Sequence, residues 1–262
     1  MLVTDRRQKI IEILRIQGSV KVEELSRHLQ VSEETIRRDL NILEEEGQLN
    51  RVYGGAYLGH LVNQTLPNDM RKETMQAEKQ RVAELCAGMI RNGDTIMLDC
   101  STTAYYLAKR IINYKNLTVI TNSLDIAFLL SSTDDIHVVC CGGHLNKKYM
   151  SFIELDALES LGKYYADICF VSCTGIDLKN GLNDSIEMQG RIRREMIRRS
   201  QKKVCIADMT KIGKTTFFEI LPLHEIDALV LDAEPPRQWL EGLAESNVIC
   251  YYPGCTEQEG RA

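Results

Sequence analysis

The sequence predicts an α/β protein in which a small helical domain precedes a larger domain with a mostly parallel sheet. Two observations predict this: residues 1–56 carry short helix-periodic apolar stripes, and from residue 74 apolar strand-like runs alternate with amphipathic helices. The chain has 262 residues, of which 44% are apolar. This length can bury a core without disulfides or a structural metal, and the composition excludes an intrinsically disordered chain.

The first 58 residues predict three short helices and a hairpin. Ser32, followed by Glu33 and Glu34, marks the start of the third helix, because a serine cap and early negative charge suit a helix N-terminus. Gly47 ends this helix, and Gly54-Gly55 predicts the turn between two short strands. The apolar stripes of the three helices are Ile10, Ile11 and Leu14; Val22, Leu25 and Leu29; and Ile36, Leu40 and Leu43.

The second and third helices, joined by the turn at residues 30–32, have the proportions of a helix-turn-helix. With the apolar stripe of the third helix facing inward, its N-terminal half points Arg and Asn side chains outward, where they can pair with guanine and adenine in the major groove. Hydroxyls at the helix N-terminus suit a phosphate, and a basic hairpin residue suits the DNA backbone or the minor groove. The predicted DNA-binding residues are Ser32, Thr35, Arg37, Arg38, Asn41 and Arg51.

The charge balance limits the kind of DNA binding that is expected. The net charge of −5 excludes a uniformly basic nucleic-acid coat protein, and residues 1–60 carry nine Lys and Arg against ten Asp and Glu. Arg37-Arg38 alone would favour ordinary solvated charges, whereas the whole pattern of turn, outward face and hairpin favours DNA binding. A further alternative is that this domain is an adaptor that binds protein instead of DNA.

The larger domain is expected to place polar segments at the ends of its strands. Strands are expected at 95–100, 117–121, 136–141, 166–173, 203–207, 228–232 and 248–252, and helices at 74–90, 103–112, 123–131, 154–163, 187–200 and 236–246. In an open α/β sheet, ligands bind beyond the carboxyl ends of the strands. Four such ends are hydroxyl-rich or glycine-rich, and a fifth supplies a lysine.

A helix begins directly after the strand at 95–100, so its free N–H groups and neighbouring hydroxyls suit a phosphate. A serine that only caps the helix would produce the same local pattern, but the other strand ends favour a ligand site. The predicted site for a phosphorylated sugar comprises Asp99, Ser101, Thr102, Thr103, Thr121, Asn122, Gly142, Gly143, Thr174, Gly175, Asp177 and Lys211.

Residues 6–56 resemble the N-terminal winged helix of DeoR-type bacterial transcriptional regulators, and the run VSEETIRRDL followed by RVYGGA is the most specific part of the match. The resemblance implies a unit that binds operator DNA, mostly as a repressor. The matching stretches are Arg6-Arg7, Val22–Leu25, Val31–Leu40, Leu43–Gly47 and Arg51–Ala56.

Residues 76–253 resemble the sensor domain of the same family, which is similar in fold to ribose-5-phosphate isomerase. The resemblance implies that a phosphorylated sugar or related metabolite binds there and alters DNA affinity. Two departures stand out: Ser101 replaces the usual glycine, and the segment 154–163 lacks an expected Gly-Pro. The matching pieces are Asp94–Asp99, Thr102-Thr103, Val119–Ser123, Gly142-Gly143, Gly175–Asp177, Ala207-Asp208 and Lys211.

We therefore expect a repressor of a carbohydrate-metabolism operon that acts as a homodimer or homotetramer, without catalytic residues, cofactor or metal. The alternative is a sugar-phosphate isomerase-like enzyme that uses Asp99, Asp177 and either Lys179 or Glu187. The expected domains are a winged helix-turn-helix at 1–57, a linker at 58–75, a sensor domain at 76–255 and a tail at 256–262.

The remaining features favour a cytoplasmic protein. No apolar run reaches the roughly 18 residues of a membrane span, and nine scattered cysteines without a CxxC pair argue against zinc and for a reduced compartment. Six of these cysteines lie in or beside strand-like runs and are expected to be small buried hydrophobes. The basic run at 191–203 is expected to be a solvated helix face, with a second DNA surface or a subunit interface as the alternative.

Overall fold

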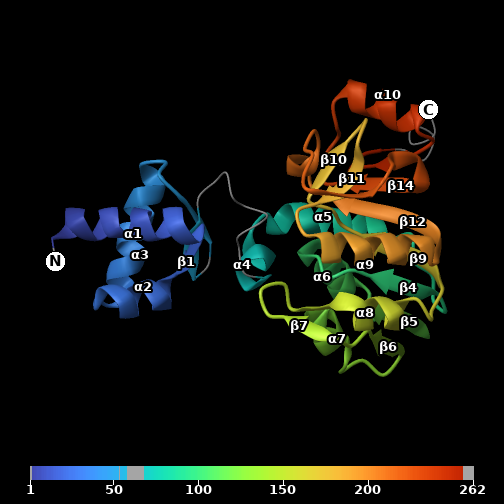
Figure 1. Cartoon of the computed structure of the whole chain (residues 1–262), viewed down its shortest axis with the longest axis horizontal. Helices are drawn as coiled ribbons and strands as arrows, with labels where there is room; N and C mark the ends of the chain where they lie inside the picture. The colour runs from blue at the N-terminus through green and yellow to red at the C-terminus, as the bar shows by residue number, and fades with distance from the viewer. Residues whose placement is uncertain (1, 53, 58–67, 256–262) are drawn as a thin grey trace. The chain divides into compact units, whose positions relative to one another are not determined.

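The computed structural model describes residues 2–52, 54–57 and 68–255 (Figure 1). The chain divides into two compact units, Met1–Thr74 and Met75–Ala262, which we call the N-terminal and C-terminal units. No helix within the described residues is long and apolar enough to cross a membrane.

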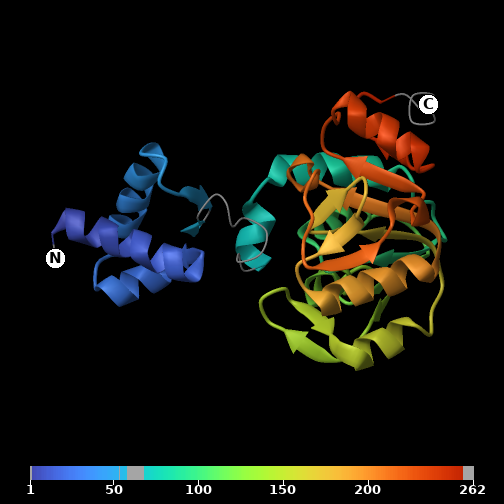
Figure 2. The same cartoon turned by 45° about the horizontal axis from the view of Figure 1, so that its top comes forward.

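Within the described residues, the N-terminal unit contains four helices and a small antiparallel sheet; Figures 1 and 2 draw the first three helices and the sheet in blue and the fourth helix in teal. The three predicted apolar stripes meet in one core, in which Ile10, Leu14, Ile36 and Leu40 are fully buried. The sheet has the order β1-β3-β2. The elements are α1 (Val3–Gln17), β1 (Ser19–Lys21), α2 (Val22–Leu29), α3 (Glu33–Glu45), β2 (Asn50–Val52), β3 (Gly55–Tyr57) and α4 (Asn68–Glu73).

Two features of this unit differ from the sequence expectation. The strand β1 was not predicted; it pairs with β3 and completes a three-stranded sheet. The expected linker at 58–75 contains the helix α4, whose Met70 is buried against Val52 and Tyr57 of the sheet. Residues 53 and 58–67, on which parts of the predicted hairpin and linker fall, lie outside the described residues.

The C-terminal unit is built on a seven-stranded sheet of order β15-β14-β12-β9-β4-β5-β6. All neighbouring strands in it run parallel, which confirms the predicted α/β class. The strands are β4 (Thr95–Leu98), β5 (Leu117–Thr121), β6 (Ile136–Cys140), β9 (Ala166–Val171), β12 (Ser200–Ala207), β14 (Ala228–Leu231) and β15 (Ile249–Tyr251).

Helices cover both faces of this sheet. One apolar core joins α5, α6 and α7 to strand residues such as Ile96 and Phe170, and the other joins α8, α9 and α10 to residues such as Met97 and Cys169. Because alternate residues of one strand face opposite layers, both sets must be apolar, which explains the continuous apolar runs in the sequence. The helices are α5 (Gln76–Ala87), α6 (Thr102–Arg110), α7 (Leu124–Leu130), α8 (Glu154–Leu161), α9 (Glu187–Arg198) and α10 (Arg237–Glu245).

Two small antiparallel sheets were not predicted, because their strands are short and lack an apolar alternation. Short 3-10 helices were also not predicted. The order of the larger of these sheets is β10-β11-β13. The extra elements are β7 (His144–Asn146), β8 (Ser151–Ile153), β10 (Gly175–Asp177), β11 (Gly181–Asp184), β13 (Phe218–Leu221) and the 3-10 helices η2 (Met209–Lys211) and η3 (Leu223–Glu225).

Boundary differences matter mainly next to the predicted ligand site. The strand expected at 95–100 ends at Leu98, so Asp99 and Cys100 lie in the connection to α6, and β12 begins at Ser200 instead of residue 203. Of the six cysteines expected to be buried, five are; Cys140, at the end of the edge strand β6, is exposed.

Candidate nucleic-acid interface and ligand site

The N-terminus of α3 is built as the sequence predicts. Ser32 is the N-cap, and its hydroxyl oxygen accepts a hydrogen bond from the Thr35 backbone N–H at 3.3 Å. The two hydroxyls lie 2.9 Å apart. Ser32 is exposed and Thr35 is half-buried, so the start of the helix presents hydroxyl and N–H groups where a DNA phosphate can bind.

Three predicted base-reading side chains, Arg37, Arg38 and Asn41, are exposed on α3. Arg37 forms an ion pair with Glu33 one turn earlier, with 2.7 Å between Nη2 and Oε2. An exposed pair of this kind contributes a few tenths of a kcal/mol, so a base or phosphate can replace Glu33 at little cost. Arg38 makes no ion pair with any described residue.

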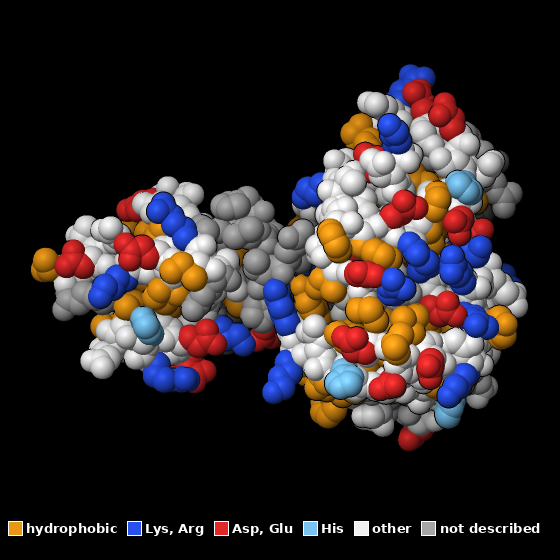
Figure 3. Space-filling model, in the orientation of Figure 1, with side chains coloured by type: hydrophobic (Ala, Val, Ile, Leu, Met, Phe, Trp, Pro, Cys, Tyr) orange, Lys and Arg blue, Asp and Glu red, His pale blue; other side chains and the backbone are white. Residues whose placement is uncertain are grey.

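Arg51 joins the hairpin to α3. Its guanidinium donates to Asn41 Oδ1, and its backbone N–H donates to Glu44 Oε1 at 2.8 Å. These bonds make the hairpin and the exposed face of α3 one continuous surface. On the face shown in Figure 3, acidic and basic side chains are interspersed over this unit, in agreement with its balanced charge.

A residue that sequence reasoning missed orients this surface. Asp39 lies on the core side of α3, 2% exposed, and accepts hydrogen bonds from Arg6 Nε at 2.5 Å and Arg7 Nε at 3.1 Å. These ion pairs fasten α1 to α3 and leave the opposite face of α3 exposed. The signal was a charged residue among the apolar positions of the third helix.

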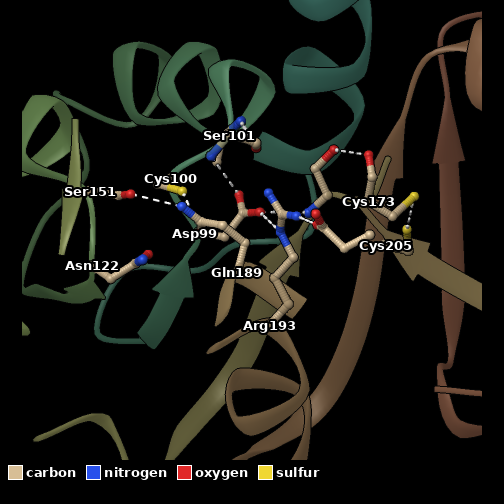
Figure 4. A network of polar contacts seen from close by, with 12 residues as sticks. Asp99, Cys100, Ser101, Asn122, Ser151, Cys173, Gln189, Arg193 and Cys205 are labelled. Carbon is tan, nitrogen blue, oxygen red and sulfur yellow. Dashed lines mark hydrogen bonds and ion pairs between the residues drawn. The ribbon is translucent and has the colours of Figure 1, made fainter. Parts of the chain in front are cut away.

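In the C-terminal unit, Asp99 is the centre of a buried polar network (Figure 4). Its Oδ1 accepts from the Ser101 backbone N–H at 3.0 Å, and its Oδ2 accepts from the Ser172 backbone N–H at 3.0 Å and from Arg193 Nε at 2.7 Å. Burial alone would raise the pKa of Asp99. The Arg193 charge and these hydrogen bonds outweigh burial and hold the pKa below its ordinary value, so the carboxylate stays ionised.

Arg193 corrects one sequence interpretation. The basic run at 191–203 was expected to be solvated, but Arg193 is buried and its guanidinium bridges Asp99 and Asp184. It belongs to the buried face of α9, together with Gln189, Ile192 and Met196. Arg191 fits the expectation, because it is exposed and pairs with Glu187 on its own helix.

Lys211 reaches the same network through Ser172. Its Nζ donates to Ser172 Oγ at 2.8 Å and lies 3.9 Å from Asp208 Oδ2. Burial would raise the pKa of Asp208, but the charge of Lys211 and hydrogen bonds from Thr210 hold it low. The structure therefore brings three predicted residues, Asp99, Ser101 and Lys211, into one connected cluster.

The first turn of α6 forms the second part of this cluster. Ser101 is its N-cap and accepts from the Ala104 backbone N–H at 3.0 Å, while Thr102 and Thr103 are buried behind it. The first N–H groups of any helix have no partner within the helix, so this turn offers donors to an anion.

Thr121 and Asn122 lie at the carboxyl end of the neighbouring strand β5, and both are fully buried. Thr121 Oγ1 accepts from the Ser123 backbone N–H at 3.0 Å. Asn122 Nδ2 donates to the Phe152 carbonyl at 3.0 Å. The hairpin of β7 and β8, which sequence reasoning missed, thereby packs against this strand end.

The remaining predicted residues have local structural roles. Gly143 has a φ of +132°, and a Cβ there would lie 3.0 Å from the Ile153 carbonyl oxygen. A Cβ on Gly142 would have no heavy atom within 4 Å. A Cβ on Gly175 would lie 2.4 Å from the Lys214 carbonyl oxygen. The Thr174 backbone N–H donates to the Asn183 carbonyl at 2.9 Å. Asp177 Oδ1 accepts three hydrogen bonds within the β10–β11 turn.

Comparison with known proteins agrees with this architecture. The model of the DeoR-like helix-turn-helix domain matches residues 6–60, and that of the DeoR C terminal sensor domain matches residues 74–233. The chain belongs to the DeoR family of transcriptional regulators.

Three individual matches illustrate the range of similarity. The uncharacterized HTH-type transcriptional regulator YulB of Bacillus subtilis is 41% identical over 89% of this chain and 90% of its own length. The glycerol-3-phosphate regulon repressor of Escherichia coli is 32% identical over 95% of this chain and 98% of its own length. Ribose 5-phosphate isomerase from Plasmodium falciparum is 17% identical, covers 53% of each chain and has a TM-score of 0.38.

Within this DeoR-family chain, the departure at Ser101 has a clear local role. Its hydroxyl oxygen caps α6, and its backbone N–H donates to Asp99. The hydroxyl proton is not used in the cap, so serine adds a donor at the helix N-terminus where a glycine would add none.

Several members of the polar network around Asp99 carry no sequence motif. Cys100 donates its thiol proton to Gln189 Oε1 at 3.1 Å, and Gln189 Nε2 donates to Ser151 Oγ at 2.9 Å. A glutamine on the buried face of a helix is the one sequence signal available for this chain of bonds. The residues that sequence reasoning missed are Ser151, Ser172, Asp184, Gln189 and Arg193.

Proposed function

We propose that this DeoR-family regulator represses a carbohydrate-metabolism operon and that a phosphorylated sugar, bound at the carboxyl ends of β4, β5 and β9, controls its affinity for the operator. The observation that carries the proposal is the convergence of the α6 N-terminus, Lys211 and buried polar side chains at one edge of the parallel sheet. The name of the Escherichia coli relative, a glycerol-3-phosphate regulon repressor, supports a phosphorylated carbon compound as the signal.

The charges in the cluster indicate how a phosphate would be held. Arg193 already faces two carboxylates, and Lys211 lies near Asp208, so the buried side chains carry no excess positive charge. Attraction for the anion therefore comes mainly from the N-terminal N–H groups of α6 and from the hydroxyls of Ser101 and Thr102.

The isomerase-like alternative lacks a converging acid and base. Asp99 is buried and paired with Arg193, and Asp177 holds the β10–β11 turn. Of the two candidates for the third group, Glu187 is paired with Arg191 and Lys179 is exposed. A general base must lie within hydrogen-bond reach of the proton that it removes. Three separately engaged carboxylates do not meet this requirement, so we propose that the chain binds its ligand without turning it over.

We further propose that the protein acts in the cytoplasm as a homodimer or homotetramer. Helix-turn-helix regulators commonly bind paired half-sites on double-stranded DNA, which a symmetric oligomer matches. The described cysteines are all free thiols, as a reducing compartment favours.

The test combines operator binding with a ligand panel. Fluorescence anisotropy at fixed salt should show binding to DNA from the regulator's own operon, and one phosphorylated sugar should change that affinity. Thr102→Ala should abolish the response to this sugar and preserve operator binding, because Thr102 lies in the first turn of α6. An unchanged response would remove the α6 turn from the site, and turnover of any panel member would favour the enzyme.

A further inference from the structure

A buried amide oxygen at the end of β5 has no hydrogen-bond partner in the described part of the chain. Asn122 is fully buried, its side-chain Nδ2 donates to the Phe152 carbonyl at 3.0 Å, and its backbone carbonyl accepts from the Phe152 N–H at 2.8 Å. These bonds fix the orientation of the amide. The side-chain Oδ1 is left without a donor, and because an unpaired buried acceptor is destabilising, a donor on a bound molecule would be favoured there.

A hydroxyl donor lies in β8, the strand whose Phe152 is the hydrogen-bond partner of Asn122. Ser151, also fully buried, precedes Phe152, and a backbone bridge pairs it with Ser123. Its Oγ accepts from Gln189 Nε2 at 2.9 Å, and Gln189 Oε1 in turn accepts from the Cys100 thiol at 3.1 Å. Figure 4 shows Ser151 and Asn122 on the same side of Asp99.

The direction of these bonds determines which proton is available. Gln189 presents its amide N–H to Ser151, because its oxygen is occupied by Cys100. Ser151 Oγ therefore accepts, and its own proton has no acceptor among the residues that the structure describes. The strand ends thus hold one unpaired acceptor, Asn122 Oδ1, and one available donor, the Ser151 hydroxyl.

A neutral hydroxyl group matches this pair, because it donates one hydrogen bond and accepts others. A phosphate or carboxylate oxygen has no proton to donate to Asn122 Oδ1 and would bring negative charge against it. An ammonium group could donate to Asn122 but could not accept from Ser151. Of these groups, the hydroxyl is the one that satisfies both side chains.

We infer that Asn122 and Ser151 form a hydroxyl-binding subsite that recognises the neutral polyol part of the ligand, with Gln189 as the residue that positions Ser151. This inference rests on the proposed function, in which the phosphate binds at the start of α6. Cys100, at the end of the hydrogen-bond chain, directly precedes the α6 cap Ser101 and so connects the two parts of the site. The ligand is then a polyol phosphate whose phosphate faces α6 and whose hydroxyl faces β5 and β8.

The experiment is calorimetric titration of the full-length protein with matched probes. The probes are inorganic phosphate, propyl phosphate, pentose and hexose phosphates, and the same sugars without phosphate. Wild type should bind at least one sugar phosphate about tenfold or more tighter than propyl phosphate. Asn122→Leu and Ser151→Ala should each remove most of that preference and leave affinity for propyl phosphate unchanged. Gln189→Leu should lower the same preference.

Ser200→Ala is the matched control, because Ser200 is a buried serine of the same unit whose hydroxyl donates to the Met196 carbonyl. It should bind every probe as wild type does. Thermal unfolding without ligand tests folding of the variants. Asn122→Leu removes both the unpaired acceptor and the Nδ2 donor to the Phe152 carbonyl, and because these two effects on stability have opposite signs, this variant should melt within a few degrees of wild type. If that variant does not fold, Ser151→Ala and Ser151→Thr test the subsite, and the threonine should retain the preference.

The possible outcomes separate this inference from the proposed function. Sugar-phosphate binding that is identical in wild type and both variants would overturn the subsite and leave the proposed function intact. An equal loss for sugar phosphates and propyl phosphate would also overturn it, because that indicates general damage. If the wild type binds only unphosphorylated sugars and the variants lose this binding, the result would support the subsite and contradict the proposal that the ligand carries a phosphate. Binding of no probe would overturn both.

Discussion

Arg38 in the N-terminal unit and Arg193 in the C-terminal unit represent two opposite uses of the same side chain. Arg38 is exposed on α3, and no described residue forms an ion pair with it. Arg193 is 7% exposed and lies between two carboxylates. The first charge is available to a partner, whereas the second is used within the fold. A list of basic residues therefore identifies a nucleic-acid surface only after burial has separated the two kinds.

The largest expected effect concerns the buried charge. Arg193→Ala leaves Asp99 and Asp184 buried without their cation, which should reduce the free energy of unfolding by about 3–5 kcal/mol. Urea unfolding followed by circular dichroism measures this, with Arg191→Ala, an exposed residue of the same helix, as the control. The control should change stability by less than about 0.5 kcal/mol. Equal losses of stability in the two variants would contradict the view that the buried Arg193 stabilises the fold more than an exposed arginine does.

The exposed charge should affect DNA binding without affecting stability. Arg38→Ala should weaken binding to the operator by about 1–3 kcal/mol and binding to random DNA only slightly, because a bidentate contact to a base discriminates by this amount. Competition anisotropy at constant salt compares the two DNAs. Arg15→Ala, which removes an exposed arginine of α1, should alter neither. A uniform loss on both DNAs would make Arg38 a phosphate contact instead of a base reader.

The smallest expected effect is that of the ion pair between the half-buried Lys21 and the exposed Asp69, whose Nζ and Oδ2 lie 2.5 Å apart. Asp69→Asn should reduce the free energy of unfolding by less than about 1 kcal/mol. Burial would raise the pKa of Asp69, but the hydrogen bond from Lys21 holds it below its ordinary value. The contribution is thus present above pH about 3.9 and is lost as the pH falls through the lowered pKa.

Thermal unfolding of wild type and Asp69→Asn between pH 2 and pH 7 (values chosen to span roughly the carboxylate range) measures this contribution. The two curves should converge at the acid end. A difference that persists there would mean that Asp69 stabilises the unit through packing. Asp99 has a lowered pKa of the same sign, so the C-terminal unit should also lose stability toward acid.

The sequence predicted the features that depend on neighbouring residues along the chain. The Ser32 cap, the apolar stripe of α3 and the Ser101 turn all appear where they were expected, because each is a local signal of helix geometry. The alternation of parallel strands and helices was also visible, since buried strands need apolar residues on both faces.

The features that it could not predict depend on residues far apart in the sequence. Arg193 meets Asp99 across 94 positions, and Gln189 meets Ser151 across 38. Arg193 and Gln189 are polar residues of the helix α9, and polar side chains on helices are far more often exposed to solvent than buried. Their burial follows from how α9 and β8 pack at the sheet edge, which no local pattern specifies.

The packing of α4 has a consequence for the design of chimeric regulators. A Cβ on Gly55 would lie 2.7 Å from Met70 Cε and 2.2 Å from the Val20 carbonyl oxygen, so this glycine admits both the helix and the neighbouring strand. A DNA-binding head cut at residue 57 would lose Met70 and uncover Val52 and Tyr57. Heads exchanged between family members should instead be joined after Thr74, where the compact N-terminal unit ends.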